Sequence, residues 1–506
     1  FVVSEQVVSD RVDRGEHAGR VWLGGDTKSR SIFRVDRMER PEWVLLGVFG
    51  VVTFVVLLTG HSIVSLVVAS GIAAVGWGLT VRVSVPGTSL DSSVALWVRT
   101  RVSWVVRGWA RIRSGPGGVA PAGVGSLLLT DVETPVGVVG VAEHGGVADG
   151  GAAGGYVTAV VEAQGQVWAS GEAWVRMSMS TMSPVVPALK LPASAPEAPT
   201  PTTSMSLWAA KIVASDWAPM ASSSPSAELV DSYAQIVDDL GRIASAQRTW
   251  VTLRIPAEAL VVPGRKVDTV AAAGRVVANV VERADGLGIA MRPLSVVGRG
   301  ALARHMMDPS FSPDDYVGVG EAWEGVWPSW RATDDGGCVD VDSPLGVWRE
   351  SMWGVPASRI VPGWLSRDWL YRALRDVEDV PVRTFVVAAE VQSRAQAVKA
   401  AREDLTSDLA ALRKTEGVVS TGEEDAQAGS SAIRVRDLSP ESGAGGVRWS
   451  MAVGLHATPE TWDDAARHMT SALEDCSISA PARLRFRQDQ VLPWMLGVGL
   501  AWKKGR

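Results

Sequence analysis

The sequence predicts a membrane-anchored protein of mixed α/β (α+β) class, in which a two-helix transmembrane hairpin precedes a mixed α/β cytoplasmic domain. Two observations predict this architecture. The first is a stretch of 41 residues near the N-terminus, Pro41 to Val81, that contains no Lys or Arg. The second is the remainder of the chain, which alternates between strand-like and helix-like hydrophobic patterns. With 506 residues, 46% of them hydrophobic, the chain is long enough to bury a sizeable core.

Composition and charge exclude several classes of protein. Charged residues make up 21% of the chain and there are only two cysteines, so a disordered or disulfide-stapled protein is excluded. Cys338 and Cys476 stand apart, without a CxxC pair, and predict neither a zinc site nor a disulfide. The net charge of -6 divides into +5 up to residue 113 and -11 after it. Because the bulk of the chain is acidic, we expect no nucleic-acid partner.

A cytoplasmic segment, residues 1–40, precedes the predicted hairpin, residues 41–82. The hairpin divides into two apolar runs, Trp43 to Leu58 and Ile63 to Val81, of 16 and 19 residues. As helices these runs would reach roughly 24 and 28 Å, close to the ~30 Å thickness of a bilayer core. A hairpin buried in a soluble core is the alternative. It is disfavoured because apolar residues occur all round both runs, leaving no polar face.

Flanking cations predict the orientation of the hairpin. Arginines and one lysine precede the first run and six arginines follow the second, whereas the short turn between the runs carries neither residue type. By the positive-inside rule, we expect a multi-pass protein of the plasma (inner) membrane with both termini in the cytoplasm. Tryptophans near the ends of the runs and the basic residues after them are the expected membrane-interface residues. They are Trp43, Trp77, Arg82, Arg99, Arg101, Trp104 and Arg107.

Residues 83–114 are predicted to form a basic amphipathic juxtamembrane helix. Apolar residues such as Leu96, Trp97 and Trp109 recur at helical spacing among five arginines between residues 89 and 113. Such a segment could lie on the anionic inner leaflet. A solvated helix packed on the following domain is the alternative.

The cytoplasmic domain, residues 115–506, is predicted to contain strands at 156–162, 249–255, 384–391 and 449–455. Helical stripes occur at 230–244, 270–284, 398–412 and 462–473, the last with Thr458 as its N-cap and Pro459 at its first position. A Pro/Ser/Thr-rich stretch at about 177–206 has too little periodicity for a packed element and is interpreted as an insertion or linker. Residues 426–446 are interpreted as a long surface loop.

No motif in the sequence predicts catalysis. The chain contains no Gly-Lys dipeptide, which excludes a conventional P-loop ATPase, and no HExxH, GxSxG or complete GxGxxG motif. The six histidines, His305 and His456 among them, form no close pair and are interpreted as surface or locally bonded residues. Asp340 and Asp342 could share a divalent cation, although an acidic edge or turn is the favoured explanation. We therefore expect no catalytic residue, no metal and no cofactor.

The order of these features resembles EccE, a membrane component of actinobacterial type VII (ESX) secretion systems. The residues that carry the resemblance are the hairpin with its basic exit, the strand Tyr156 to Glu162, and Arg248 to Ile255 followed by the helix of 267–286. The segment Gln488 to Gly497 is similar to the closing segment of the family. Its ending, Met495-Leu-Gly497, departs from the family's Leu-Pro-Leu-Gly-like pattern, as do the long stretch of 177–206 and the loop of 426–446.

The resemblance implies a non-catalytic scaffold at the periphery of an inner-membrane channel, with EccB-, EccC- and EccD-like partners, of which EccC supplies the ATPase. The alternative is a membrane scaffold of an actinobacterial conjugative type IV secretion system, resembling the N-terminal domain of a secretion ATPase. A third hypothesis is a membrane-tethered glycosyltransferase that uses Asp340 and Asp342, because the EccE cytoplasmic domain has been likened to a degenerate enzyme of that class.

Overall fold

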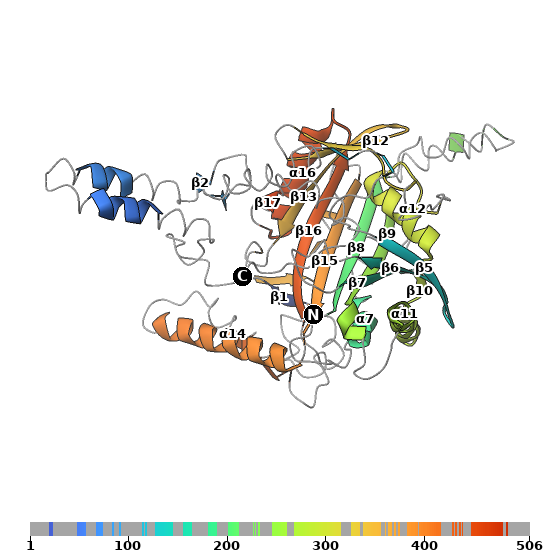
Figure 1. Cartoon of the computed structure of the whole chain (residues 1–506), viewed down its shortest axis with the longest axis horizontal. Coiled ribbons are helices and arrows are strands. Elements are labelled where there is room, and N and C mark those ends of the chain that lie inside the picture. The colour runs from blue at the N-terminus through green and yellow to red at the C-terminus, as the bar shows by residue number, and fades with distance from the viewer. Residues whose placement is uncertain are drawn as a thin grey trace.

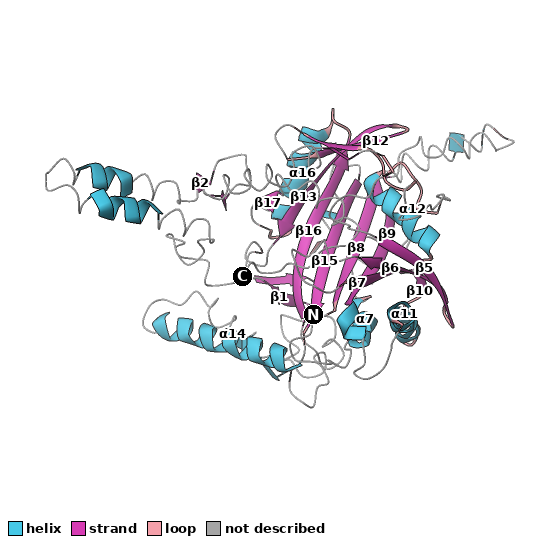
Figure 2. Ribbon diagram, in the orientation of Figure 1, coloured by secondary structure: helices cyan, strands magenta, loops and turns pink. Residues whose placement is uncertain are grey.

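A computed structural model shows that the protein is a mixed α/β structure built on one large antiparallel sheet (Figures 1 and 2). The residues that it describes are 20–23, 48–56, 67–73, 83–84, 91–92, 114–115, 117–118, 127–144, 155–163, 181–189, 201–211, 226, 228, 231–232, 245–260, 268–314, 325–333, 337–355, 360, 363–366, 369–370, 373–374, 382–392, 394–415, 428–429, 431–432, 435–436, 438, 447–478 and 482–483.

The large sheet contains thirteen strands. Its order is β4 (Ser114–Gly115), β11 (Trp330–Ala332), β12 (Val339–Ser343), β13 (Gly346–Val355), β16 (Val447–Ala457), β15 (Val382–Val391), β8 (Thr202–Lys211), β9 (Ser245–Pro256), β7 (Tyr156–Ala163), β6 (Gly137–His144) and β5 (Leu127–Thr134). Off this path, β10 (Met291–Pro293) pairs with β7 and β17 (Ala482–Arg483) pairs with β13. Two small sheets pair β1 (Arg20–Leu23) with β14 (Gly363–Ser366), and β2 (Val83–Ser84) with β3 (Asp91–Ser92).

The strand order contains an internal repeat related by an approximate twofold axis. Read from the edge inward, the order β5-β6-β7-β9-β8 matches the order β11-β12-β13-β16-β15. In both halves the chain runs from the fourth strand of this order, β9 or β16, into a helix, α11 (Thr269–Asp285) or α16 (Trp462–Asp475). The helix leads to a short strand, β10 or β17, that pairs with the third strand of the order, β7 or β13. The axis passes between β8 and β15, where Ser206 lies opposite Val386. We call the half that contains β5 to β9 repeat one and the half that contains β11, β12, β13, β15 and β16 repeat two.

Helices cover both faces of the sheet because its strands bury both sets of alternating side chains. Leu253 packs in the core beneath α7 (Met182–Ala188), α11 and α16, whereas Trp250 of the same strand packs in a second core with α12 (Val296–Met307). α10 (Ala257–Leu260) directly follows β9. α14 (Arg394–Thr415) lies between β15 and β16 along the chain. Near-continuous burial, as in β7, is expected of strands covered on both faces.

Two helical stretches, residues 48–56 and 67–73, lie away from the sheet in the view of Figure 1. Their outward side chains are apolar: Val51 is 64% exposed and Val67 is 66% exposed, whereas Ala69 is buried. None of the helices in the described part of the chain combines the length and apolar character that a membrane crossing requires.

The four strands predicted between residues 156 and 455 are confirmed as β7, β9, β15 and β16, and three of the four predicted helices as α11, α14 and α16. Most of the predicted helix at 230–244 lies outside the described residues. The predicted N-cap of α16 is wrong by three residues. The helix begins at Trp462 after Thr461, and the hydroxyl of Thr458 is within hydrogen-bond distance of the Thr461 hydroxyl, at 3.1 Å.

Three other predictions need correction. The stretch 177–206 is not simply an insertion, because it contains the buried helix α7 and the start of β8, a central strand of the sheet. Part of the predicted juxtamembrane helix, residues 83–114, forms the paired strands β2 and β3 instead, and most of the remainder lies outside the described residues. Within the loop of 426–446, Ser431 is buried and its hydroxyl donates to the Asp408 carboxylate at 2.6 Å.

Candidate functional site

Polar side chains gather where α12 crosses the sheet. The helix begins against β6 at Gly140, where an added Cβ would lie 2.4 Å from the backbone of Ser295 and Val296, so only glycine allows this approach. The Ser295 hydroxyl accepts from the Gly298 N–H at 3.2 Å, and the Asp131 carboxylate accepts from the Val296 N–H at 2.8 Å. These contacts fix the position of the first turn of α12 on repeat one.

Arg299 extends from α12 into the interior of repeat one. Its guanidinium donates to the Thr158 carbonyl at 2.7 Å, to the Thr158 hydroxyl at 2.7 Å and to the Gly140 carbonyl at 3.0 Å. Burial lowers the pKa of Arg299 to about 9 despite the nearby Asp131, so the side chain is still a cation at pH 7. This buried cation ties α12 to β6 and β7 through oxygen acceptors.

His305 lies near the C-terminal end of α12, in contact with two tryptophans. Its ring centroid is 4.5 Å from that of Trp208 and 5.9 Å from that of Trp250. Nδ1 is 2.6 Å from the Phe311 carbonyl oxygen, and because a carbonyl can only accept, Nδ1 carries the proton. Burial lowers the pKa of His305 to about 4, which makes the ring neutral at pH 7.

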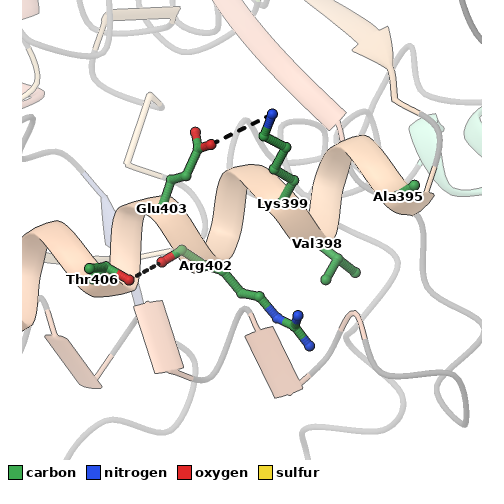
Figure 3. Close-up of a pocket in the computed structure, with 6 residues that line it drawn as sticks. All are labelled: Ala395, Val398, Lys399, Arg402, Glu403 and Thr406. Carbon is green, nitrogen blue, oxygen red and sulfur yellow. Dashed lines mark hydrogen bonds and ion pairs between the residues drawn. The ribbon is translucent and has the colours of Figure 1, made fainter.

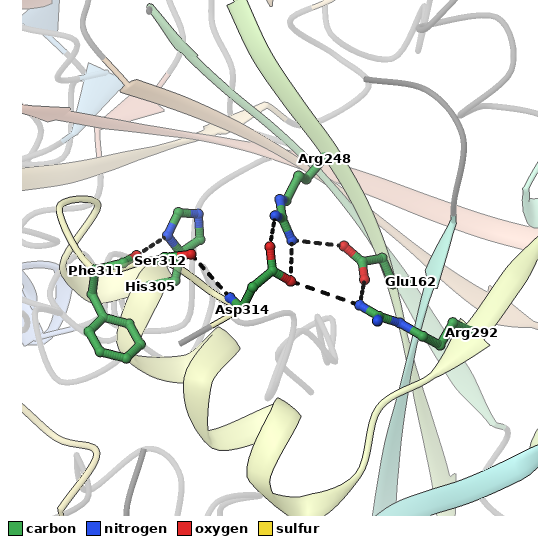
Figure 4. A network of polar contacts seen from close by, with 7 residues as sticks. All are labelled: Glu162, Arg248, Arg292, His305, Phe311, Ser312 and Asp314. Carbon is green, nitrogen blue, oxygen red and sulfur yellow. Dashed lines mark hydrogen bonds and ion pairs between the residues drawn. The ribbon is translucent and has the colours of Figure 1, made fainter. Parts of the chain in front are cut away.

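Two arginines and two carboxylates form an ion network beside His305 (Figure 4). The Glu162 carboxylate of β7 accepts from Arg248 of β9 at 3.2 Å and from Arg292 of β10 at 2.6 Å. Asp314, which follows α12, accepts from both Nη atoms of Arg248, and its Oδ1 is 4.0 Å from Nη2 of Arg292. The hydrogen bond from Arg248 holds the pKa of the Asp314 carboxyl below its ordinary value.

A second buried pair joins α12 to repeat two. Nε2 of His456 is 3.0 Å from the Met306 carbonyl oxygen and 3.4 Å from Oε1 of Glu350, and both side chains are fully buried. Burial raises the pKa of Glu350 well above its ordinary value and lowers the pKa of His456 to about 4. Burial therefore favours the uncharged form of both side chains.

The residues proposed from the sequence do not meet at this site. All seven predicted membrane-interface residues lie outside the described residues: Trp43, Trp77, Arg82, Arg99, Arg101, Trp104 and Arg107. The Asp340 carboxylate accepts from Arg349 at 2.7 and 2.9 Å, whereas Asp342 is exposed on the same strand. Within the described ranges, no three His, Cys, Asp or Glu side chains are grouped so that they could hold a metal ion.

The sequence interpretation missed the ion network because its four members come from three strands and the segment after α12, and it missed the pair of Glu350 and His456 because the two residues lie on different strands. Only a weak signal exists: Glu350 and His456 interrupt the apolar positions of two otherwise buried strands. The interpretation of His456 and His305 as locally bonded residues is confirmed, but neither lies on the surface. Chemically, the arrangement supports ion pairing and buried hydrogen bonding.

A depression lies along α14 (Figure 3). Its described lining comes entirely from three turns of this one helix: Ala395, Val398, Lys399, Arg402, Glu403 and Thr406. Lys399 lies 4.0 Å from Glu403, and the Thr406 hydroxyl donates to the Arg402 carbonyl at 2.8 Å. These ordinary contacts within one exposed helix do not converge on a point where a ligand could be held.

Comparison of the sequence with models of known protein families gives no match, and comparison with curated protein sequences gives none either.

Proposed function

We propose that the chain is a non-catalytic scaffold subunit of a type VII (ESX) secretion complex. In this proposal it resembles EccE, is anchored in the plasma membrane by the hairpin of residues 41–82, and places its large sheet in the cytoplasm with EccB-, EccC- and EccD-like partners. The chemistry of the described site supports a structural role. Its histidines are buried and neutral, and its carboxylates and guanidiniums bind one another.

The observation that carries the proposal is the apolar surface of the two helical stretches at 48–56 and 67–73. Their exposed side chains are Val48, Val51, Val52, Phe54, Val55, Val67 and Val68. A cluster of this kind is unfavourable in water, whereas lipid chains would solvate it. The same stretch of sequence contains no Lys or Arg from residue 41 to residue 81.

A charge placed on this surface tests the membrane anchor. In the full chain, Phe54→Asp should move the protein from the carbonate-washed membrane fraction to the supernatant, because an aspartate at a helix centre costs about 2.5–3.5 kcal/mol in a bilayer. Leu345→Asp is the matched control, since Leu345 is 81% exposed on the turn between β12 and β13. Equal release of both variants, or release of the wild type, would contradict the anchor.

Co-purification tests the secretion complex separately from the anchor. The full chain, extracted in mild detergent from its native membrane, should bring with it EccC- and EccD-like proteins in fixed proportion. Recovery with a DNA-transfer ATPase instead would identify the alternative, a conjugative type IV scaffold. Recovery as a free monomer would contradict both.

A further inference from the structure

Arg248 and Arg292 flank a single carboxylate on the sheet. β7 pairs with β9 along one side and with β10 along the other, so arginines from the two outer strands reach Glu162 of the central one. Arg292 lies directly opposite Glu162 in the register. One carboxylate therefore faces two guanidiniums, and these three side chains together carry a charge of +1.

Asp314 supplies the second carboxylate from outside the sheet. Both Nη atoms of Arg248 donate to its two oxygens, which is the planar fork geometry by which arginine recognises a carboxylate. The two carboxylates differ in their setting. The Glu162 side chain is 10% exposed on a central strand, whereas the Asp314 side chain is 55% exposed at the end of the segment that follows α12.

We propose that Arg248 and Arg292 form a binding site for a carboxylate of an acidic segment of a partner protein, and that Asp314 occupies this site from within the chain as a competitor. The receptor groups are held on paired strands, and Glu162 fixes their spacing. The occupant, Asp314, belongs to the segment that follows α12 and points toward Arg248 (Figure 4). Its side chain is 55% exposed. Displacing Asp314 exchanges one carboxylate for another and leaves the charge of the site unchanged.

The charge of Glu162 favours a carboxylate over a phosphate. A phosphate group would bring close to two negative charges beside a carboxylate that already shares both arginines. A carboxylate brings one, which matches the +1 left by Glu162 and the two guanidiniums. The inference does not depend on the membrane anchor, so it can fail or hold independently of the proposed secretion role.

Because Asp314 is attached to the same chain, it competes with any external carboxylate for the two arginines. A tethered competitor acts at an effective concentration of the order of millimolar, so an external carboxylate binds only to the fraction of molecules in which Asp314 has left. Removing the Asp314 charge should therefore tighten binding of an acidic ligand, whereas removing Arg248 should abolish it.

Calorimetric titration of the detergent-solubilised full chain tests the proposal. The probe is an acetylated and amidated tetrapeptide of alternating aspartate and glutamate, with inorganic phosphate titrated in parallel. We expect Asp314→Ala to bind the peptide at least tenfold more tightly than the wild type, and the double variant Asp314→Ala with Arg248→Gln to lose the gain. Asp464→Ala is the matched control, because it removes an exposed aspartate from a single arginine, Arg467, and should leave binding unchanged.

Each other outcome overturns the proposal. If Asp314→Ala binds the peptide no better than the wild type, Asp314 is only a structural ion-pair partner. If phosphate binds more tightly than the peptide, the site does not recognise an acidic protein segment. Asp314→Asn keeps the size of the side chain and serves where the alanine variant unfolds, as judged by circular dichroism. Failure of both variants to fold also assigns Asp314 a purely structural role.

Discussion

Repeats one and two have the same strand order but differ in the chemistry of one row. The row is a pair of facing residues at equivalent positions on the third and fourth strands of each repeat. In repeat one the row contains Thr158 opposite Arg254, and in repeat two it contains Glu350 opposite His456. In the row of repeat one, the guanidinium of Arg254 lies 4.0 Å from the ring centroid of Tyr156. The hydroxyl of Thr158 accepts from the guanidinium of Arg299. In the row of repeat two, burial favours the uncharged form of both side chains, raising the pKa of Glu350 and lowering that of His456.

This difference teaches that one core runs through both repeats while the polar row on the opposite face changes between them. On the face beneath α11 and α16, Met205 and Phe385 occupy equivalent positions and are buried in one core. That face also buries polar side chains at equivalent positions, Thr203 and Arg383. On the face beneath α12, the equivalent pairs are Thr158 with Arg254 and Glu350 with His456.

The largest expected effect tests whether the repeats fold as one unit. Phe385→Ala should reduce the free energy of unfolding by about 3–5 kcal/mol, and Met205→Ala at the equivalent position by about 2–5 kcal/mol. Both residues are fully buried in the same core, so each variant should shift a single cooperative transition in urea. Two separate transitions, each sensitive to one variant, would show that the repeats are independent domains.

Removing the buried cation of repeat one should have the next largest effect. Arg299→Met keeps the side-chain length but leaves the acceptors on Gly140 and Thr158 without these donors, at a cost of about 2–3 kcal/mol. Chemical denaturation measures the loss. Arg304→Met, on the same helix but less buried, is the control and should cost clearly less. Equal losses would mean that the buried bonds of Arg299 add nothing to stability.

The neutral pair of repeat two predicts a particular pH dependence. Because the folded state holds a proton on Glu350 above the ordinary pKa of 4.5, the stability from this group is complete below that pH and is lost as the pH rises. Glu350→Gln removes this loss and should stabilise the protein at pH 8, with little change at pH 5. Denaturation midpoints at the two pH values measure the effect, and a variant destabilised at both would contradict the protonated state.

His305 and His456 make the stability of the protein change with pH in the opposite direction, over a lower pH range. Their folded pKa values are depressed, so their contribution is complete above about pH 6.5 and is lost as the pH falls toward 4. His456→Gln should reduce this acid sensitivity by up to about half, because His305 remains. The check is a denaturation series from pH 7 to pH 4.5. An acid slope that is unchanged in the variant would show that His456 is charged in the folded protein.

The smallest effect concerns the tight turn of repeat two. Gly346, between β12 and β13, has a φ of +133°, which a residue with a Cβ rarely adopts. Gly346→Ala should therefore cost about 1–2 kcal/mol, as measured by thermal unfolding. Gly288→Ala, at a φ of +72°, should cost less because that value lies in the left-handed region open to other residues.

Part of the fold could be predicted because local periodicity reports burial. The alternation around Leu253 placed β9, and the helical spacing of Val277 and Leu409 placed α11 and α14. The Ser- and Thr-rich β8 was missed because its small polar side chains hide the alternation, although the strand is buried at the centre of the sheet. The ion network was missed because Glu162, Arg248 and Asp314 are far apart in sequence.

The sequence by itself determined four strands and three helices, and that the chain is of mixed α/β class, because the spacing of apolar residues records which side of an element is buried. The tertiary structure alone decided the strand order, the internal repeat and the pairing of Glu350 with His456. These depend on contacts between residues that are distant in the sequence, and a linear pattern carries no information about which strand lies beside which.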